Sequence, residues 1–325
     1  QAGRLRWGRP HDESASMSNP ATRRLFSAAA LFTLLAVAMG SVVCATQSGF
    51  ECGHWPGCDA NALLPNGPLT AALFKNPWIE MVHRTSAILA GPTALIAAVV
   101  AARRRDAGAL VKVLPWVAVA GAIVAGYVGR GVVIGQRFPA WVSAADLGSA
   151  LAAMMATLVA AVAVRRAAPG TPAVWAPSRQ ARLAWSAVGV LLVMHLVSLY
   201  AAGPGSYTRC MSWPVWGLLS ADAAGSLPLQ YARFALAGLA ALLIVAAFAA
   251  GPRARAAQAS VALLVIVAAL GAFIRVTGTD DLGAPYSVAT VALLWTLTLL
   301  AARGSLLRSH TRTIPSVDAV ATSRP

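Results

Sequence analysis

Cys52-Gly-His-Trp-Pro-Gly-Cys58 opens a stretch that ends in Glu80-Met-Val-His83-Arg84, where a long apolar run begins. Two cysteines, a glutamate and a histidine lie here within about one loop of each other, and the chain has few such groups elsewhere. Nearly everything on either side of this stretch is apolar. We therefore expect any chemistry of the protein to take place here.

The composition indicates an integral membrane protein. The 325 residues are 58% hydrophobic and 11% charged, with a mean hydropathy of +0.66, whereas soluble domains carry roughly 25% charged residues. The net charge of +15 does not favour nucleic-acid binding, because the basic residues sit in short loops between apolar runs. It indicates membrane topology instead, through the positive-inside rule.

Eight apolar runs are long enough to cross a membrane as helices, each needing about 20 residues. We predict an all-α protein with spans at about 25–46, 78–102, 112–134, 141–164, 183–202, 228–250, 257–276 and 285–302. The connections at 103–105, 165–182 and 253–255 are basic, and so are both tails. We therefore predict a protein of the cell (inner) membrane with both termini in the cytoplasm. The loop from Cys52 to Pro77 then faces outward. All four cysteines fall on that side, which we expect to be the oxidising one.

The chain contains an internal repeat. Ser48-Gly-Phe-Glu-Cys52, followed by Trp-Pro, has a counterpart in Ser206-Tyr-Thr-Arg-Cys210, also followed by Trp-Pro. This predicts two tandem four-helix bundles related by a pseudo-two-fold axis, since parallel repeats of this kind are a known membrane plan. The expected parts are a cytoplasmic segment 1–24, a first bundle 25–164 with the outer cysteine loop, a cytoplasmic linker 165–182, a second bundle 183–303 and a cytoplasmic tail 304–325.

Cys52 and Cys58 predict a disulfide in the outer loop, because a six-residue step can turn back far enough to join them. The bridge is either a structural staple of the long loop or redox-active, although its spacing is too wide for a thioredoxin-like motif. A zinc site with His54 is the weaker alternative, since a fourth ligand is missing.

His83 and Glu80 share one helix face near the outer membrane boundary. Ionisable groups inside a membrane segment are costly and usually functional. His83 is a candidate haem ligand, with Glu80 transferring protons or orienting the imidazole. The alternative is an interfacial histidine bonded to Glu80 and packed under the loop.

The remaining polar groups are weaker candidates. His195, in the middle of the fifth span, is a haem ligand or is hydrogen-bonded to a neighbour. Asp146, in the fourth span, should be paired or protonated. Arg84 and Arg130, near the outer face, could hold haem propionates, or could snorkel or form ion pairs.

These motifs resemble the haem A synthase family, integral membrane enzymes that oxidise haem O to haem A for terminal oxidases. The match comprises Thr46-Gln-Ser-Gly-Phe-Glu-Cys52-Gly-His-Trp-Pro-Gly-Cys58, Trp78-Ile-Glu80-Met-Val-His83-Arg84 and the duplicated eight-helix layout. The resemblance implies a disulfide in the outer loop, a catalytic glutamate, and a substrate haem held between histidines of the second and fourth helices. A haem b cofactor would lie between histidines of the sixth and eighth.

The sequence departs from the family at three of the four haem ligands. Only His83 matches; Asp146 and Ala232 stand at two ligand positions, and the eighth span has no histidine. We therefore expect at most one haem, bound by His83 and five-coordinate or completed by His54 or a non-histidine group. The predicted function is a haem A synthase-like protein that binds or modifies haem. The alternative is a degenerate member acting as a haem-handling or structural subunit among terminal-oxidase assembly or respiratory-complex proteins.

Overall fold

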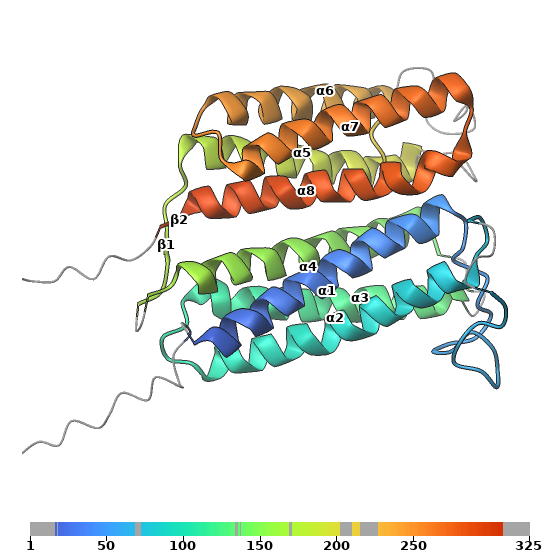
Figure 1. The fold of residues 1–325 in the computed structure, drawn as a ribbon, viewed down its shortest axis with the longest axis horizontal. Helices are drawn as coiled ribbons and strands as arrows, with labels where there is room; N and C mark the ends of the chain where they lie inside the picture. Colours follow the sequence, from blue (N-terminus) through green and yellow to red (C-terminus); the bar gives the residue numbers. More distant parts are fainter. Residues whose placement is uncertain are drawn as a thin grey trace, which may run out of the picture.

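The protein is a mainly helical integral membrane protein, and the part of the chain that the structure describes contains eight helices long and apolar enough to cross a membrane (Figure 1). The computed structural model describes residues 17, 19–68, 73–133, 136, 138–168, 171–201, 210–214 and 227–307. The helices are α1 (Pro20–Ala45), α2 (Pro77–Arg103), α3 (Ala109–Val133), α4 (Ala140–Arg166), α5 (Arg179–Ala201), α6 (Leu227–Ala249), α7 (Arg255–Thr277) and α8 (Gly283–Ser305). This confirms the predicted number and kind of elements.

All eight helices begin before the predicted apolar runs, because residues that flank each run also take up helical structure. At 23 to 27 residues, the helices are about 35–40 Å long. The outer loop and the amino-terminal segment lead into helices in the same way. Asn19 and Asn76 accept hydrogen bonds from the backbone N–H groups of Ala21 and Trp78, and each is followed by proline. An asparagine cap with proline at the first helical position is a strong helix start.

The first four helices lie together, and so do the last four (Figure 1). In the first group α1 packs on α2 and α4, and α3 packs on α2 and α4; in the second, α5 packs on α6 and α8. α4 and α8 are the most enclosed helices, since α8 also packs against α1 and α4. The grouping follows the predicted order of elements, while the pseudo-two-fold relation stays a prediction.

Two short strands that the sequence did not predict join the linker to the end of α8. β1 (Val174–Trp175) pairs antiparallel with β2 (Leu306–Leu307), with Val174 opposite Leu307. Nearby, the backbone N–H of Ala176 donates to the carbonyl of Ser305 over 2.7 Å. The linker between the two helix groups is thus fixed to the last transmembrane helix.

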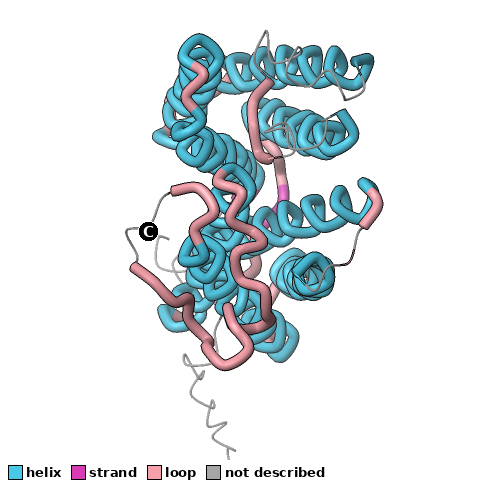
Figure 2. Tube along the Cα trace, turned by 90° about the vertical axis from the view of Figure 1, so that its right-hand side faces the viewer, coloured by secondary structure: helices cyan, strands magenta, loops and turns pink. Residues whose placement is uncertain are grey.

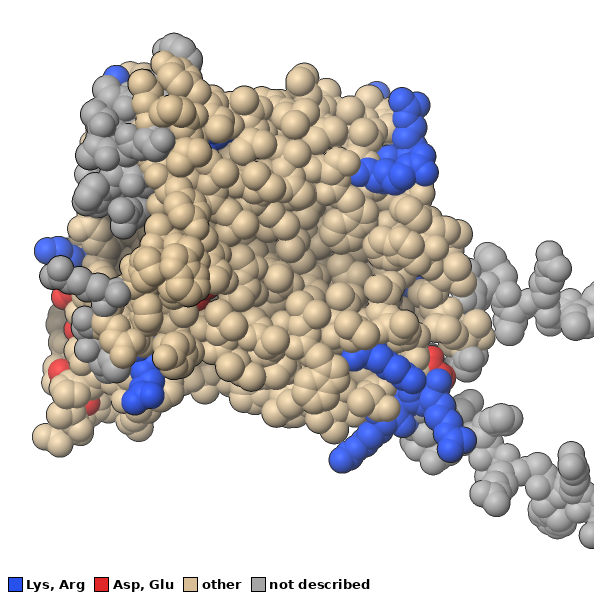
Figure 3. Space-filling view, turned by 180° about the vertical axis from the view of Figure 1, so that it is seen from behind, with Lys and Arg blue, Asp and Glu red and all other residues tan. Residues whose placement is uncertain are grey.

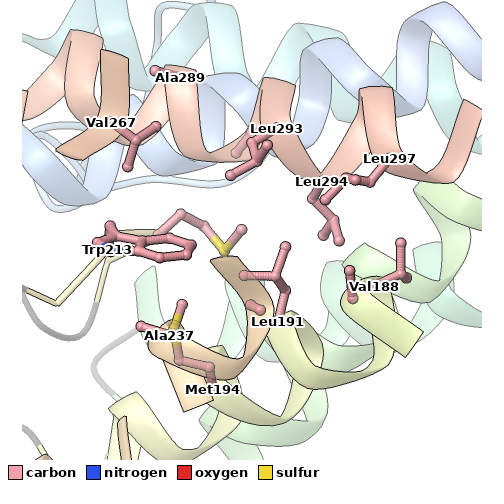
Figure 4. Packing of buried hydrophobic residues seen from close by; sticks show 14 of the residues in the cluster. Val188, Leu191, Met194, Trp213, Ala237, Val267, Ala289, Leu293, Leu294 and Leu297 are labelled. Carbon is pink, nitrogen blue, oxygen red and sulfur yellow. The ribbon is translucent and has the colours of Figure 1, made fainter. Parts of the chain in front are cut away.

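The largest buried apolar cluster among the described residues is centred on the second group of helices and extends to Leu151 and Met154 of α4. Figure 4 shows Leu191 and Met194 of α5 near Ala237 of α6, with Leu293 and Leu294 of α8 opposite. Trp213, from the loop between α5 and α6, belongs to the same cluster and is buried. A loop residue therefore completes the core of the second group.

Charged side chains divide between the two ends of the helices (Figure 3). The end that carries the α2–α3 loop, the linker and the α6–α7 loop is rich in exposed arginines, namely Arg103, Arg105, Arg165, Arg179, Arg182, Arg253, Arg255 and Arg303. The opposite end carries exposed Glu51, Asp59 and Asp281 together with fewer exposed basic residues, namely Lys75, Arg130 and Arg275. Figure 2, which looks onto this second end, shows long loop segments over the first helix group.

Candidate functional site

A buried ion pair lies at the outer end of α2. Arg84 Nη2 is 2.5 Å from Glu80 Oε1, one helical turn away. The second carboxylate oxygen, Oε2, accepts a 2.9 Å hydrogen bond from the backbone N–H of Cys52. Glu80 is 3% exposed and Arg84 8%. A charge buried this deeply requires such pairing, so the predicted Glu80–His83 contact is replaced by a Glu80–Arg84 contact.

Arg84 also holds the outer loop, through hydrogen bonds to backbone carbonyls of the loop. Arg84 Nη1 donates to the carbonyls of His54 and Gly57 over 2.5 and 2.7 Å, and Nη2 donates to the carbonyl of Cys52 over 2.9 Å. A planar guanidinium suits several acceptors at fixed angles. Gly57 is required at this point, because a Cβ there would lie 2.7 Å from the carbonyl oxygen of Ala62. Arg84 is therefore the anchor of the loop in this structure.

The predicted disulfide between Cys52 and Cys58 is present. Both residues are buried and form a small cluster with Met81 of α2. Two disulfide-bonded sulfurs cannot serve as thiolate ligands, which removes the zinc alternative with His54. The bridge, Arg84 and Glu80 together form a compact unit, which we call the loop clamp (Glu80, Arg84, Cys52, Cys58).

His83 turns away from the loop clamp toward α1. Its Nδ1 lies 3.0 Å from the backbone carbonyl oxygen of Ala36. A carbonyl can only accept, so Nδ1 carries the hydrogen and a neutral imidazole has its lone pair on Nε2. Among the residues that the structure describes, Nε2 has no hydrogen-bond partner. The ring lies against Gly40, where an added Cβ would come 3.1 Å from Cε1.

The other predicted haem-site residues are not brought together with His83. The His54 side chain is exposed on the loop, and no hydrogen bond joins it to His83 within the described part of the chain. Arg130 is exposed in the last turn of α3. Their proposed roles beside a haem stay predictions.

Asp146 and His195 occupy separate places. Asp146 is half-buried in α4, and the structure gives its carboxylate no hydrogen bond or ion pair among the described residues. His195 is buried in α5, and its Nδ1 lies 2.6 Å from the carbonyl oxygen of Leu191. Of the two predictions for His195, a haem ligand or a residue hydrogen-bonded to a neighbour, this contact agrees with the second.

A second disulfide, which the sequence analysis missed, joins Cys44 at the end of α1 to Cys210. Residues 210–214, which we call the plug segment, follow this bridge. Arg233 Nη2 lies 3.4 Å from both the carbonyl oxygen and Oγ of Ser212, and the Tyr286 hydroxyl donates to the carbonyl of Trp213. The sequence did contain a signal for this second bridge. Once Cys52 and Cys58 are paired, the two remaining cysteines lie on the same predicted side of the membrane and could pair with each other.

Comparison with protein-family models and with curated proteins finds no match for this chain. The resemblance to haem A synthases therefore rests on the residues quoted above, and their geometry is the basis for a proposed function.

Proposed function

We propose that the protein binds haem through His83 at the outer half of its first helix group, as a haem A synthase-like protein of terminal-oxidase haem biogenesis. The observation that carries this proposal is the imidazole geometry. Metal-ligating histidines almost always donate their second ring N–H to a carboxylate, a backbone carbonyl or water. His83 makes this contact to Ala36, which fixes the tautomer and leaves Nε2 available as a ligand atom.

The other residues of the site would hold the haem in place and keep water away from it. Haem, when bound, supplies the iron-centred redox chemistry. The loop clamp holds the outer loop over the end of α2, one turn from His83, where it would exclude water from the site. Arg84 already donates to four acceptors, so Arg130 is the better candidate for a propionate partner.

A second candidate function, a haem-handling or structural subunit without turnover, is favoured by one observation. Both oxygens of the Glu80 carboxylate are already engaged, one by Arg84 and the other by the N–H of Cys52. A proton-transferring glutamate would have to leave these contacts first. Under this alternative the loop clamp serves only to stabilise the outer loop.

The charge distribution supports the part of the proposal that puts the protein in the cell (inner) membrane with both termini in the cytoplasm. Exposed basic residues lie at both ends of the helices but are more numerous at the end that carries the linker, and cytoplasmic loops carry the excess of basic residues. The two disulfides lie at the other end, which agrees with an oxidising outer compartment. Partners in terminal-oxidase assembly belong to the same proposal.

The absorbance spectrum of the purified protein tests the haem assignment. We expect at most one haem per chain, and its loss in His83→Ala. A high-spin spectrum would indicate five-coordinate iron, whereas a low-spin spectrum abolished by His54→Ala would indicate a second ligand from the loop. Full haem content in His83→Ala would refute the assignment. An empty protein, under conditions that load an intact haem A synthase, would favour the structural subunit.

A further inference from the structure

The two disulfides differ in how accessible their cysteines are from outside the protein. Cys52 and Cys58 are 1% and 3% exposed and pack with Met81 of α2. In the other bridge Cys210 is 6% exposed, whereas Cys44 is exposed. Because side chains enclose the backbone of a helix, the exposed surface of Cys44 is mainly that of its Cβ and Sγ atoms. A thiol can therefore reach one sulfur of this bridge without any movement of the protein.

Cys44 also lies where the chain meets water. It is the last but one residue of α1, about 3 Å along the helix axis from the turn at Thr46. The carbonyl of Thr46 accepts a 2.9 Å hydrogen bond from the backbone N–H of Lys75, and both Gln47 and Lys75 are exposed. Lipid-exposed turns do not occur within the hydrocarbon region of a bilayer. A water-soluble protein can therefore approach Cys44.

The bridge of the loop clamp is shielded by its own hydrogen bonds. The backbone N–H of Cys52 donates to Glu80, and its carbonyl accepts from Arg84. Both partners are buried in α2. Exchange requires a thiolate to attack a disulfide sulfur, so its rate depends on access to that sulfur. Here the outer loop must first move away from α2.

The plug segment keeps other contacts when the bridge to Cys44 opens. Arg233 Nη2 lies 3.4 Å from the carbonyl oxygen of Ser212, and the Tyr286 hydroxyl donates to the carbonyl of Trp213. Trp213 is 8% exposed and packs in the apolar cluster of the second helix group (Figure 4). Opening the bridge therefore releases the segment from α1 but leaves it in contact with α6 and α8, so the bridge can open and close in the folded protein.

We propose that the Cys44–Cys210 bridge is a thiol–disulfide exchange site for a dithiol protein of the thioredoxin class. A thiolate of this partner attacks Cys44 Sγ, the bond between the two sulfurs breaks, and its electron pair leaves on Cys210 Sγ, which takes up a proton. The second thiol of the partner then attacks the mixed disulfide and releases Cys44, which is protonated in turn. The protein gains two thiols, the partner becomes a disulfide, and the reverse reaction closes the bridge.

Reduction kinetics of the purified full-length protein in detergent test the proposal. Samples treated with glutathione are quenched at intervals with N-ethylmaleimide, digested without further reduction and mapped by mass. We expect the Cys44–Cys210 bridge to open at least about tenfold faster than the Cys52–Cys58 bridge, since access to the sulfur differs. Equal rates, or faster opening of Cys52–Cys58, would overturn the proposal.

The sulfur that is attacked can be identified with a thioredoxin whose resolving cysteine is replaced by serine, because its mixed disulfide persists. We expect the cross-link on Cys44 and, after quenching, the maleimide on Cys210. Cys44→Ser with Cys210→Ser is the control and should give no cross-link. A cross-link on Cys210, Cys52 or Cys58, or none where glutathione opens the bridge, would refute the exchange site.

Discussion

Gly40 of α1 lies directly against the imidazole of His83, so that a Cβ at position 40 would come 3.1 Å from Cε1. This close approach allows Nδ1 to reach the carbonyl of Ala36, one turn earlier in α1. A side chain at position 40 must push the ring away from α1. The orientation of the proposed haem ligand thus depends on the absence of a side chain on the neighbouring helix.

Replacing this glycine should therefore impair haem binding. In Gly40→Val we expect the His83–Ala36 hydrogen bond to break and haem content to fall by at least several-fold, measured by absorbance per mole of protein. Gly126→Val is the matched control, because an added Cβ there meets nothing within 4 Å while the helix-propensity change is the same. Equal haem content in both variants would contradict the role of Gly40.

Removing the arginine of the loop clamp should destabilise the outer end of the protein. Arg84→Met leaves the Glu80 carboxylate buried without its counter-charge, a change that typically costs about 3–5 kcal/mol of unfolding free energy. Arg84→Lys should recover little of this unfolding free energy. A lysine ammonium cannot donate hydrogen bonds to three carbonyls and a carboxylate in the planar arrangement that the guanidinium uses.

The coupling of the two residues can be measured by a double-mutant cycle of Arg84→Met and Glu80→Gln, followed by chemical unfolding in detergent. For residues in direct contact we expect an interaction energy of about 0.5–3 kcal/mol. Strict additivity would show that the ion pair does not form in solution.

The disulfide pairing predicts two cross-linked peptide pairs in a non-reduced digest, Cys44 with Cys210 and Cys52 with Cys58. Mass mapping of protein from freshly prepared membranes checks this. Recovery of Cys44 linked to Cys52 or Cys58, or of four free thiols, would refute the pairing.

Loss of the longer bridge should loosen the plug segment. This bridge ties Cys210, the first residue of the segment, to Cys44 at the end of α1, whereas the Cys52–Cys58 bridge lies within the outer loop. We expect Cys44→Ser with Cys210→Ser to raise hydrogen exchange in residues 210–214, whereas Cys52→Ser with Cys58→Ser should not. Unchanged exchange in the first pair would mean that Arg233 and Tyr286 hold the segment alone.

The proposed orientation is tested with single introduced cysteines in a background without the native four. A membrane-impermeant maleimide added from outside should label Asn61→Cys in the outer loop and spare Ser178→Cys beside the linker. Both positions are exposed. Labelling of Ser178→Cys with protection of Asn61→Cys would invert the topology.

Hydropathy was enough to predict all eight helices, because a membrane span needs about 20 apolar residues whatever its neighbours are. The spacing of Cys52 and Cys58 was enough to predict their bridge. Contacts between distant segments were out of reach: Cys44 pairs with a residue 166 positions away, and β1 pairs with β2 across four helices. The i, i+3 spacing suggested that Glu80 meets His83, but the charge of Arg84 at i+4 is the stronger attraction for a buried carboxylate.

The connectivity of the two disulfides imposes an order on biosynthesis. As the chain is made, Cys44 is followed almost at once by Cys52 and Cys58, and its native partner Cys210 emerges only after four more helices have been threaded into the bilayer. An oxidant acting during that interval meets three thiols of which one must stay reduced. Capture of Cys52 by Cys58, held next to each other by the newly formed α2, would remove both wrong partners before the right one arrives.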